Sequence, residues 1–132
     1  MANRWIALGA ASGLVAVVAG AFGAHGLKDR LSPEMLAAWE TAVRYQMWHA
    51  LALLAVAGLE GRVGGLPAAA WCFAAGTVLF SGSLYVYAVT GMKWLGMTAP
   101  FGGLTLMAGW ACLAVGAAQT SSRPPQIGRA HV

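Results

Sequence analysis

Apolar residues dominate the chain in long stretches that short polar segments separate. Its eight Lys and Arg and four Asp and Glu leave uncharged intervals at residues 5–27, 45–59, 63–92 and 94–122. Since a transmembrane helix needs about 20 mainly apolar residues, the first, third and fourth intervals each suffice. The second suffices if its helix starts earlier and passes Glu40 and Arg44 near the membrane interface. The pattern predicts a four-transmembrane-helix bundle, with helices at about residues 5–24, 33–59, 67–89 and 98–118.

Residues suited to helix starts support these boundaries. Ser32, Pro33 and Glu34 fit the first turn of the second helix, which therefore has an amphipathic start. Thr98 and Pro100 fit the cap and first turn of the fourth helix in the same way. A cleaved signal peptide is the alternative for the first stretch, but its apolar run exceeds the core of about 7 to 15 residues that signals have.

Composition and charge agree with a bilayer environment. The chain is 59% hydrophobic and 9% charged, whereas soluble proteins have about 25% charged residues. The class is therefore an all-α membrane protein whose main partner is the lipid bilayer. Its net charge of +4 comes from residues that flank the apolar stretches, so it indicates no nucleic-acid partner. Balanced Lys and Arg residues predict no orientation. They are Arg4, Arg62 and Arg123 on one side and Lys28, Arg30, Arg44 and Lys93 on the other.

Small residues recur at helical spacing within the apolar stretches. In lipid such residues favour helix association, because they let two backbones approach closely. The fourth stretch has a regular seam of them, in which a large residue at Gly109 should disrupt the bundle. The candidate helix-packing residues are Gly9, Gly13, Gly20, Gly23, Gly26, Gly76, Gly102, Gly109 and Gly116.

A candidate polar cluster occurs around the second helix. Polar and ionisable side chains are costly inside a membrane unless they are paired or face water, so they are candidates for function. His25 and His49 lie toward the same membrane side, where they could meet. The alternatives are a self-satisfied network that only sets helix packing and, for His25, hydration near the headgroups. Haem ligation by the two histidines is a weaker alternative, and two ligands are too few for zinc. The cluster comprises His25, Glu40, Arg44, Tyr45, Gln46 and His49.

Hydroxyl groups in the third and fourth helices are interpreted as polar glue between helices, with the lining of a translocation path as the alternative. Ser and Thr are cheap to bury, and no charge accompanies them. Cys72 and Cys112 are interpreted as small packing residues. Because no nucleophile motif, phosphate loop or nucleotide fingerprint occurs, we expect no enzyme activity, cofactor or metal. The candidate polar glue is Thr77, Ser81, Ser83, Tyr85 and Thr98.

Four segments together resemble a known family. They are residues 20–27, 39–50, 80–85 and 95–103, with the sequences GAFGAHGL, WETAVRYQMWHA, FSGSLY and LGMTAPFGG. In this order they resemble the small bacterial inner-membrane proteins, with animal relatives, that are grouped as domain of unknown function 423. The likeness covers residues 5–118 approximately. It implies a four-helix, multi-pass protein of the bacterial plasma membrane without an assigned activity.

Two classes of function fit these features. The favoured one is an accessory or assembly protein that packs against another membrane protein, or against a second copy in a homodimer, because small-residue seams are present and deep charges are absent. The alternative is a small transporter or channel with a polar entrance formed by the first two helices. A haem or quinone protein is more remote.

The C-terminal segment is left out of the predicted fold. Residues 120–132 are expected to be a disordered tail, because Ser121, Ser122, Arg123, Pro124 and Pro125 are typical of disorder. The last six residues, IGRAHV, alternatively resemble translated sequencing-adapter sequence, which would make them an artefact.

Overall fold

The computed structural model describes residues 2–122, and the predictions for residues 123–132 lie outside this part of the chain. The described chain is all-α, with helices α1 (Ala2–His25), α2 (Pro33–Gly58), α3 (Leu66–Thr90) and α4 (Lys93–Ser121). Four helices were predicted, and the main difference in their bounds is the earlier start and later end of α4. Its last turn includes Thr120 and Ser121, which were expected in the disordered tail; the Thr120 hydroxyl donates to the Gly116 carbonyl at 2.7 Å.

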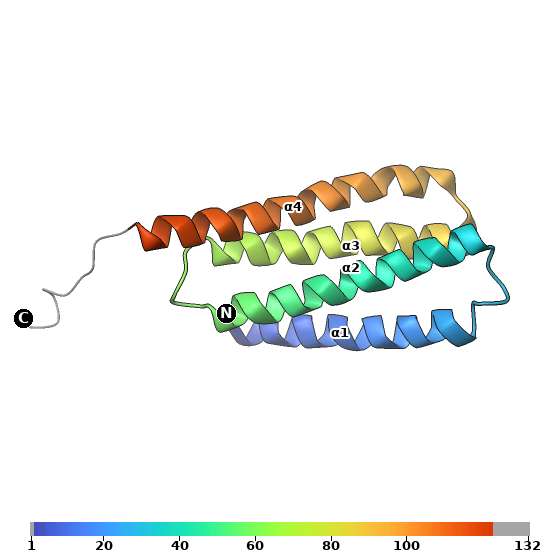
Figure 1. Cartoon of the computed structure of the whole chain (residues 1–132), viewed down its shortest axis with the longest axis horizontal. Helices are drawn as coiled ribbons and strands as arrows, with labels where there is room; N and C mark the ends of the chain where they lie inside the picture. The colour runs from blue at the N-terminus through green and yellow to red at the C-terminus, as the bar shows by residue number, and fades with distance from the viewer. Residues whose placement is uncertain (1, 123–132) are drawn as a thin grey trace, which may run out of the picture.

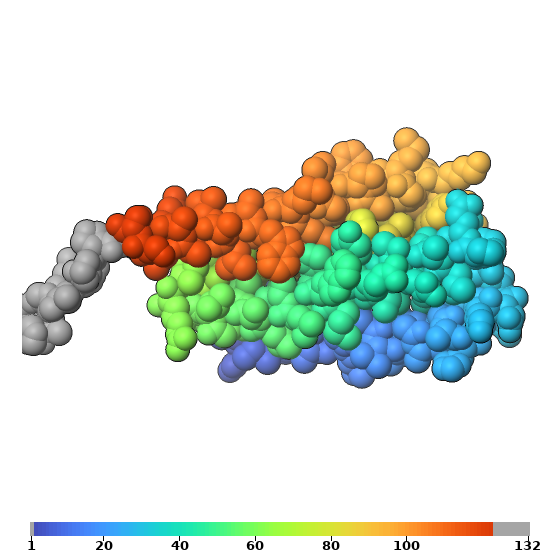
Figure 2. Space-filling view, viewed as in Figure 1, coloured from blue at the N-terminus to red at the C-terminus, as the bar shows by residue number. Residues whose placement is uncertain are grey.

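The four helices lie side by side in chain order and alternate in direction (Figure 1). Helix α1 packs against α2, α2 against α3 and α3 against α4, whereas α1 and α4 have little or no contact within residues 2–122. On the face shown in Figure 2, α2 lies between α1 and α4. The bundle is therefore an open layer in which α1 and α4 do not pack together, and α2 is the main link between α1 and the rest.

The predicted start of α2 is confirmed. The Ser32 hydroxyl oxygen accepts a hydrogen bond from the Met35 N–H at 3.2 Å, and Pro33 and Glu34 lie in the first turn. This bond satisfies one of the backbone donors that a helix start leaves without an intrahelical partner.

The predicted start of α4 is wrong. Gly91, with φ of 71°, ends α3, and only Met92 separates it from the first residue of α4. Because the chain turns this tightly, Thr98 lies inside the helix, where its hydroxyl donates to the Leu95 carbonyl at 2.8 Å. Pro100 is also inside α4, a position that transmembrane helices tolerate when neighbouring groups satisfy the freed carbonyl.

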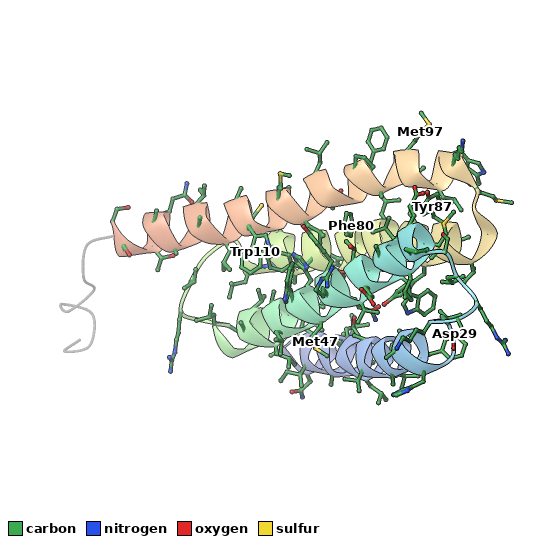
Figure 3. The ribbon with its side chains drawn as sticks, turned by 45° about the vertical axis from the view of Figure 1, so that its right-hand side comes forward. Asp29, Met47, Phe80, Tyr87, Met97 and Trp110 are labelled. Carbon is green, nitrogen blue, oxygen red and sulfur yellow. The ribbon has the colours of Figure 1, made fainter. Side chains whose placement is uncertain are left out.

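The apolar core is small, and most large apolar side chains face outward. A buried cluster of Ala52, Leu53 and Val56 from α2 and Ala69 and Phe73 from α3 forms its centre. On the outer surface, by contrast, Val78 and Met97 are 74% and 73% exposed. Figure 3 shows the Met97 side chain pointing away from the bundle. Such a surface suits lipid, since hydrocarbon chains are as apolar as the side chains.

Within residues 2–122, three helices are long and apolar enough to cross a membrane. They are α1, α3 and α4. Helix α2 has 26 residues, which is about 39 Å of helix, but Arg44, Gln46 and His49 lower its hydropathy. The coarse prediction of an all-α protein with long apolar helices therefore holds for residues 2–122.

Candidate functional site

Helix α2 is bonded to both of its neighbours through one amide side chain. Gln46 Nε2 donates to the Ser12 carbonyl of α1 at 2.9 Å, and Gln46 Oε1 accepts from the Tyr85 hydroxyl of α3 at 2.6 Å. Gln46 is only 7% exposed, and an unpaired amide would be costly in such apolar surroundings. One side chain therefore joins three helices.

Two further side chains donate to backbone carbonyls across the same interfaces. Trp39 Nε1 donates to the Ala19 carbonyl of α1 at 2.8 Å, and the Ser81 hydroxyl of α3 donates to the Ala42 carbonyl of α2 at 2.8 Å. A helix carbonyl can accept this second bond because its oxygen has two lone pairs. These bonds leave the helical ladder intact and set how α1 and α3 are rotated against α2.

The imidazole of His49 is hydrogen-bonded at both ring nitrogens. Nδ1 lies 2.7 Å from the Tyr45 carbonyl, and Trp110 Nε1 of α4 lies 3.1 Å from Nε2. A carbonyl can only accept and an indole N–H can only donate, so Nδ1 carries the proton and Nε2 keeps its lone pair. The ring is thus a neutral imidazole held in one tautomer. Phe73 packs beside it, with 5.6 Å between ring centroids.

An apolar groove lies beside this imidazole, between α2 and α4. Its volume is about 760 Å³, and we call it the α2/α4 groove. Figure 3 shows Trp110 pointing from α4 toward α2 at this place. Aromatic side chains dominate the wall, and His49 is its main polar group. The lining residues are Tyr45, Trp48, His49, Phe80, Pro100, Gly103, Leu104, Leu106, Met107 and Trp110.

The candidate polar cluster separates into two groups in the structure. Gln46 and His49 are buried and Tyr45 is half-buried, and all three lie in the middle of α2. The side chains of His25, Glu40 and Arg44 are exposed. The structure therefore brings three of the six residues into one region of the bundle and leaves the other three on its surface.

The two histidines of the cluster lie far apart along the helices. A Cβ at Gly9 of α1 would lie 3.0 Å from the Ala50 carbonyl of α2, so Gly9 is level with His49. His25 lies 16 residues further along α1, or about 24 Å by helical rise. His25 and His49 cannot therefore bind opposite faces of one haem in this arrangement.

The candidate polar glue has several kinds of partner. Ser81 and Tyr85 bond to α2, as described above. Ser83 and Thr98 lie 2.9 Å apart across α3 and α4, and because the Thr98 hydroxyl donates to Leu95, Ser83 is the donor to Thr98. Thr77 Oγ1 is buried and has no hydrogen-bond partner in the described part of the chain.

Glycines of α4 let it approach α3 at backbone distance. A Cβ at Gly102 would lie 2.7 Å from the Phe80 Cα, and one at Gly109 would lie 2.7 Å from the Phe73 ring. A Cβ at Gly116 would overlap the Gly64 carbonyl. Gly76 of α3 completes this interface, since its Cβ would lie 2.7 Å from the Leu106 side chain. The seam thus faces α3 rather than the outside.

Glycines of α1 differ in how closely they approach α2. A Cβ at Gly23 would lie 2.7 Å from the Trp39 ring and one at Gly20 would lie 3.3 Å from Val43, whereas one at Gly13 would have its nearest neighbour at 3.9 Å. Gly26 lies against Phe22 of its own turn. Of the α1 glycines that face α2, Gly13 alone has room for an extra methyl group.

A second, shallower groove lies on α3 and α4. Its volume is about 340 Å³, and we call it the α3/α4 groove. Ala68 and Ala111 are exposed along it, and the Cys112 side chain is half-buried there. Its lining is made mostly of small residues. They are Gly65, Ala68, Ala111, Cys112, Val115, Gly116 and Gln119.

Trp39 and Trp110 contribute two of the interhelical bonds, and no partner was predicted for either of them. A partly buried tryptophan usually finds an acceptor for its indole N–H, so each residue carried a signal that a bond was needed. The acceptors are a backbone carbonyl on α1 and a histidine 61 positions away. The sequence does not mark either of them as a partner.

These features define the class of the protein. Its buried Gln46, His49 and Ser81 side chains are hydrogen-bonded inside a helical bundle, and its outer surface is largely apolar. The class is that of small α-helical membrane proteins. Within it, the model of a family described as "protein of unknown function (DUF423)" matches residues 19–103, and the chain belongs to that family.

Curated relatives agree with this assignment. UPF0382 membrane protein YwdK of Bacillus subtilis is 44% identical over 116 residues, which cover 86% of this chain and 94% of that protein. UPF0382 membrane protein SSP2132 of Staphylococcus saprophyticus is 42% identical over 113 residues, covering 85% of this chain and 94% of that protein. No solved structure matches the chain. The predicted family and the membrane environment are therefore confirmed, and the relatives' names assign no activity.

Proposed function

We propose that this chain is a four-span protein of the bacterial plasma membrane that acts as an accessory or assembly protein by docking a transmembrane helix of another membrane protein. The observation that carries the proposal is the α3/α4 groove. It is an outward-facing hollow of about 340 Å³ between α3 and α4, and its lining is mostly small side chains.

The directions of the helices support four spans. Helices α1 and α3 run the same way and begin at the same end of the bundle (Figure 1). If both cross the bilayer, the chain between them must return across it, and α2 is the segment that lies alongside both. The polar side chains of α2 do not oppose this, because Gln46 and His49 are hydrogen-bonded to neighbouring helices. In lipid, paired polar groups of this kind are tolerated.

The chemistry of the α3/α4 groove supports a helix as its occupant. Fluid lipid chains gain more contact from Leu, Val and Phe than from Ala. A rigid helix, however, gains contact from small residues because its backbone can then approach closely. Ala68 on α3 and Ala111 on α4 provide such a surface, and the exposed Gln119 offers an amide near one end of the groove.

A transport function has less support from the geometry. Its polar entrance would need one opening between α1 and α2 that is lined by His25, Glu40, Tyr45, Gln46 and His49. Instead His25 and Glu40 are on the surface, and the amide of Gln46 is occupied on both sides. Coupled transport generally uses a titratable group that is accessible near the middle of the membrane.

Site-specific photo-cross-linking in native membranes tests the accessory function. A photoreactive residue at position 111 points into the α3/α4 groove, and one at position 78, where Val78 is 74% exposed, faces lipid. We expect one reproducible protein adduct from position 111 and only lipid adducts from position 78. The substitution Ala68→Leu, which fills the groove from the other wall, should abolish the adduct.

The size and identity of the adduct decide between the alternatives. Peptides from a transmembrane helix of one other membrane protein, recovered in each preparation, would support docking. An adduct of twice the chain's mass would identify a homodimer and replace the accessory role. Lipid adducts alone from position 111 would contradict both.

A further inference from the structure

The α2/α4 groove combines aromatic walls with one matched donor and acceptor. The acceptor is the lone pair on His49 Nε2, and the donor is the indole N–H of Trp110, which now bond to each other at 3.1 Å. His49 is 4% exposed and is bonded to the Tyr45 carbonyl, whereas Trp110 is 47% exposed. The indole can therefore shift within the groove while the imidazole stays fixed by the Tyr45 carbonyl.

A hydroxyl group can insert into this bond without loss. It donates its proton to His49 Nε2, and its oxygen accepts from the Trp110 N–H, so one hydrogen bond is replaced by two. A carbonyl or ether oxygen could accept from Trp110 but would leave Nε2 without a donor. A cation would meet the indole N–H and a neutral imidazole, neither of which compensates a charge.

The remaining walls select for a flat, apolar body around that hydroxyl. Tyr45 and Phe80 have ring centroids 4.5 Å apart, and Tyr45 and Trp48 have theirs 5.0 Å apart. A ring compound gains edge and offset contacts with such a set of aromatic side chains. The volume of about 760 Å³ lies within the range of about 300 to 1,000 Å³ usual for small-molecule sites.

We propose that the α2/α4 groove binds a membrane-soluble ring compound that carries a hydroxyl group, as in a phenol with an apolar substituent. The hydroxyl lies between Trp110 Nε1 and His49 Nε2, the ring lies among Tyr45, Trp48 and Phe80, and the substituent follows α4 toward Pro100. The compound reaches the groove from the lipid phase, on the face of the molecule seen in Figure 2. This site is separate from the α3/α4 groove, so it does not depend on the accessory function.

Two probes that differ only at the hydroxyl test the proposal on the full chain in lipid nanodiscs. They are 4-hexylphenol and its methyl ether, 4-hexylanisole, which has no proton to donate. Binding is followed by nuclear magnetic resonance of the Trp110 indole N–H, assigned with Trp110→Phe, and of ¹⁵N-labelled histidine. We expect the phenol to shift the His49 Nε2 and Trp110 signals and to bind about fivefold more tightly than the ether, as one net hydrogen bond predicts.

Two glycines of α4 provide a matched pair of variants. Gly103 lines the groove, and a Cβ there would make ordinary contact with the Phe80 ring at 3.8 Å, so Gly103→Leu fills the groove without disturbing the backbone. Gly96 has no neighbour within 4 Å of its Cβ position, so Gly96→Leu is the control. Phenol binding should be lost in Gly103→Leu and kept in Gly96→Leu. In His49→Phe, which removes the acceptor, the phenol and the ether should bind equally.

Several results would overturn the proposal. Equal affinity of the two probes for the unmodified chain would remove the role of the hydroxyl. Unchanged phenol binding in Gly103→Leu would place the probe elsewhere. A haem absorption band that is lost in His49→Phe, or a protein helix cross-linked to position 103, would identify a different occupant. If a variant fails to fold, the comparison of the two probes on the unmodified chain still tests the proposal.

Discussion

Helix α2 and helix α4 are attached to the bundle in two different ways. Around α2, side-chain donors reach across to backbone carbonyls, as Trp39 does to Ala19 and Ser81 does to Ala42. Between α3 and α4, glycines, which have no side chain, let the backbones approach closely instead. Gly102, for example, lies against the backbone of Phe80. Hydrogen bonds are more numerous around α2, and close backbone packing is more extensive between α3 and α4, where Ser83 and Thr98 form the one side-chain pair described above.

This difference follows from what each helix contains and from its surroundings. No hydrophobic effect draws two apolar helices together in lipid, so association needs either polar bonds or close packing. Helix α2 carries amide, indole and imidazole groups that must be satisfied, and its neighbours supply their partners. Helix α4 has few such groups, and its regularly spaced glycines provide contact area instead. Removing a bond should therefore weaken the α2 interfaces in steps, whereas adding a side chain should separate α3 from α4.

The largest effect on stability is expected at the closely packed interface between α3 and α4. A leucine at Gly102 would collide with the backbone of α3 at Phe80, which cannot move aside as a side chain can. We expect Gly102→Leu to lower the free energy of unfolding by at least about 3 kcal/mol. The measurement is unfolding in mixed micelles with added dodecyl sulfate, followed by far-ultraviolet circular dichroism.

The control for this prediction is Gly96→Leu, on the same helix, where nothing lies within 4 Å of the Cβ position. This variant should be as stable as the unmodified chain or slightly more stable, because leucine favours a helix over glycine. If the two variants unfold at the same denaturant level, the close contact of α4 with α3 does not contribute to stability.

An intermediate effect is expected when the bonds of α2 are removed. Gln46→Leu loses one bond to α1 and one to α3, and it leaves the Tyr85 hydroxyl without its acceptor. Because interhelical bonds in lipid contribute about 0.6 to 2 kcal/mol each, we expect a loss of about 2 kcal/mol.

A double-mutant cycle with Tyr85→Phe measures the Gln46–Tyr85 bond itself. The cost of the two substitutions together should be smaller than the sum of the separate costs by about 1 kcal/mol. Strict additivity would mean that the 2.6 Å contact contributes nothing and that α2 is held by packing alone.

The smallest effect on stability is expected at Gly23, where a close glycine contact and an interhelical hydrogen bond involve the same residue, Trp39. A Cβ at Gly23 would lie 2.7 Å from the Trp39 ring, and moving that ring would strain its bond to Ala19. A Cβ at Gly13 of the same helix would have its nearest neighbour at 3.9 Å. We expect Gly23→Ala to be less stable than Gly13→Ala by about 1 to 2 kcal/mol in the same unfolding experiment. A reversed order would show that the indole is free to move.

Sequence patterns predicted the elements better than the contacts. The apolar intervals and the motif of Ser32, Pro33 and Glu34 led to the start of α2, because capping is a local interaction within one turn. The similar motif at Thr98 and Pro100 led to a wrong start for α4. There the positive φ of Gly91 let the chain turn within two residues and begin a helix earlier.

At the candidate functional site, too, the sequence predicted which residues need partners but not which residues those partners are. Gln46 and His49 were singled out because polar groups in an apolar helix need partners. That requirement is a property of the residue itself. The identity of each partner depends on how two helices are rotated and shifted against each other. A backbone carbonyl at Ser12 and an indole at Trp110 carry no mark in the sequence that pairs them with α2.

By itself, the sequence determined that this protein is made of long apolar helices, that it belongs in lipid, and which residues are polar or small enough to matter. Those properties follow from single residues and from spacing within one helix. Only the tertiary structure decided that the bundle stays open between α1 and α4, that His49 faces Trp110 rather than His25, and that an aromatic groove lies beside them. These features depend on the relative placement of helices, which is set by many contacts between distant residues acting together.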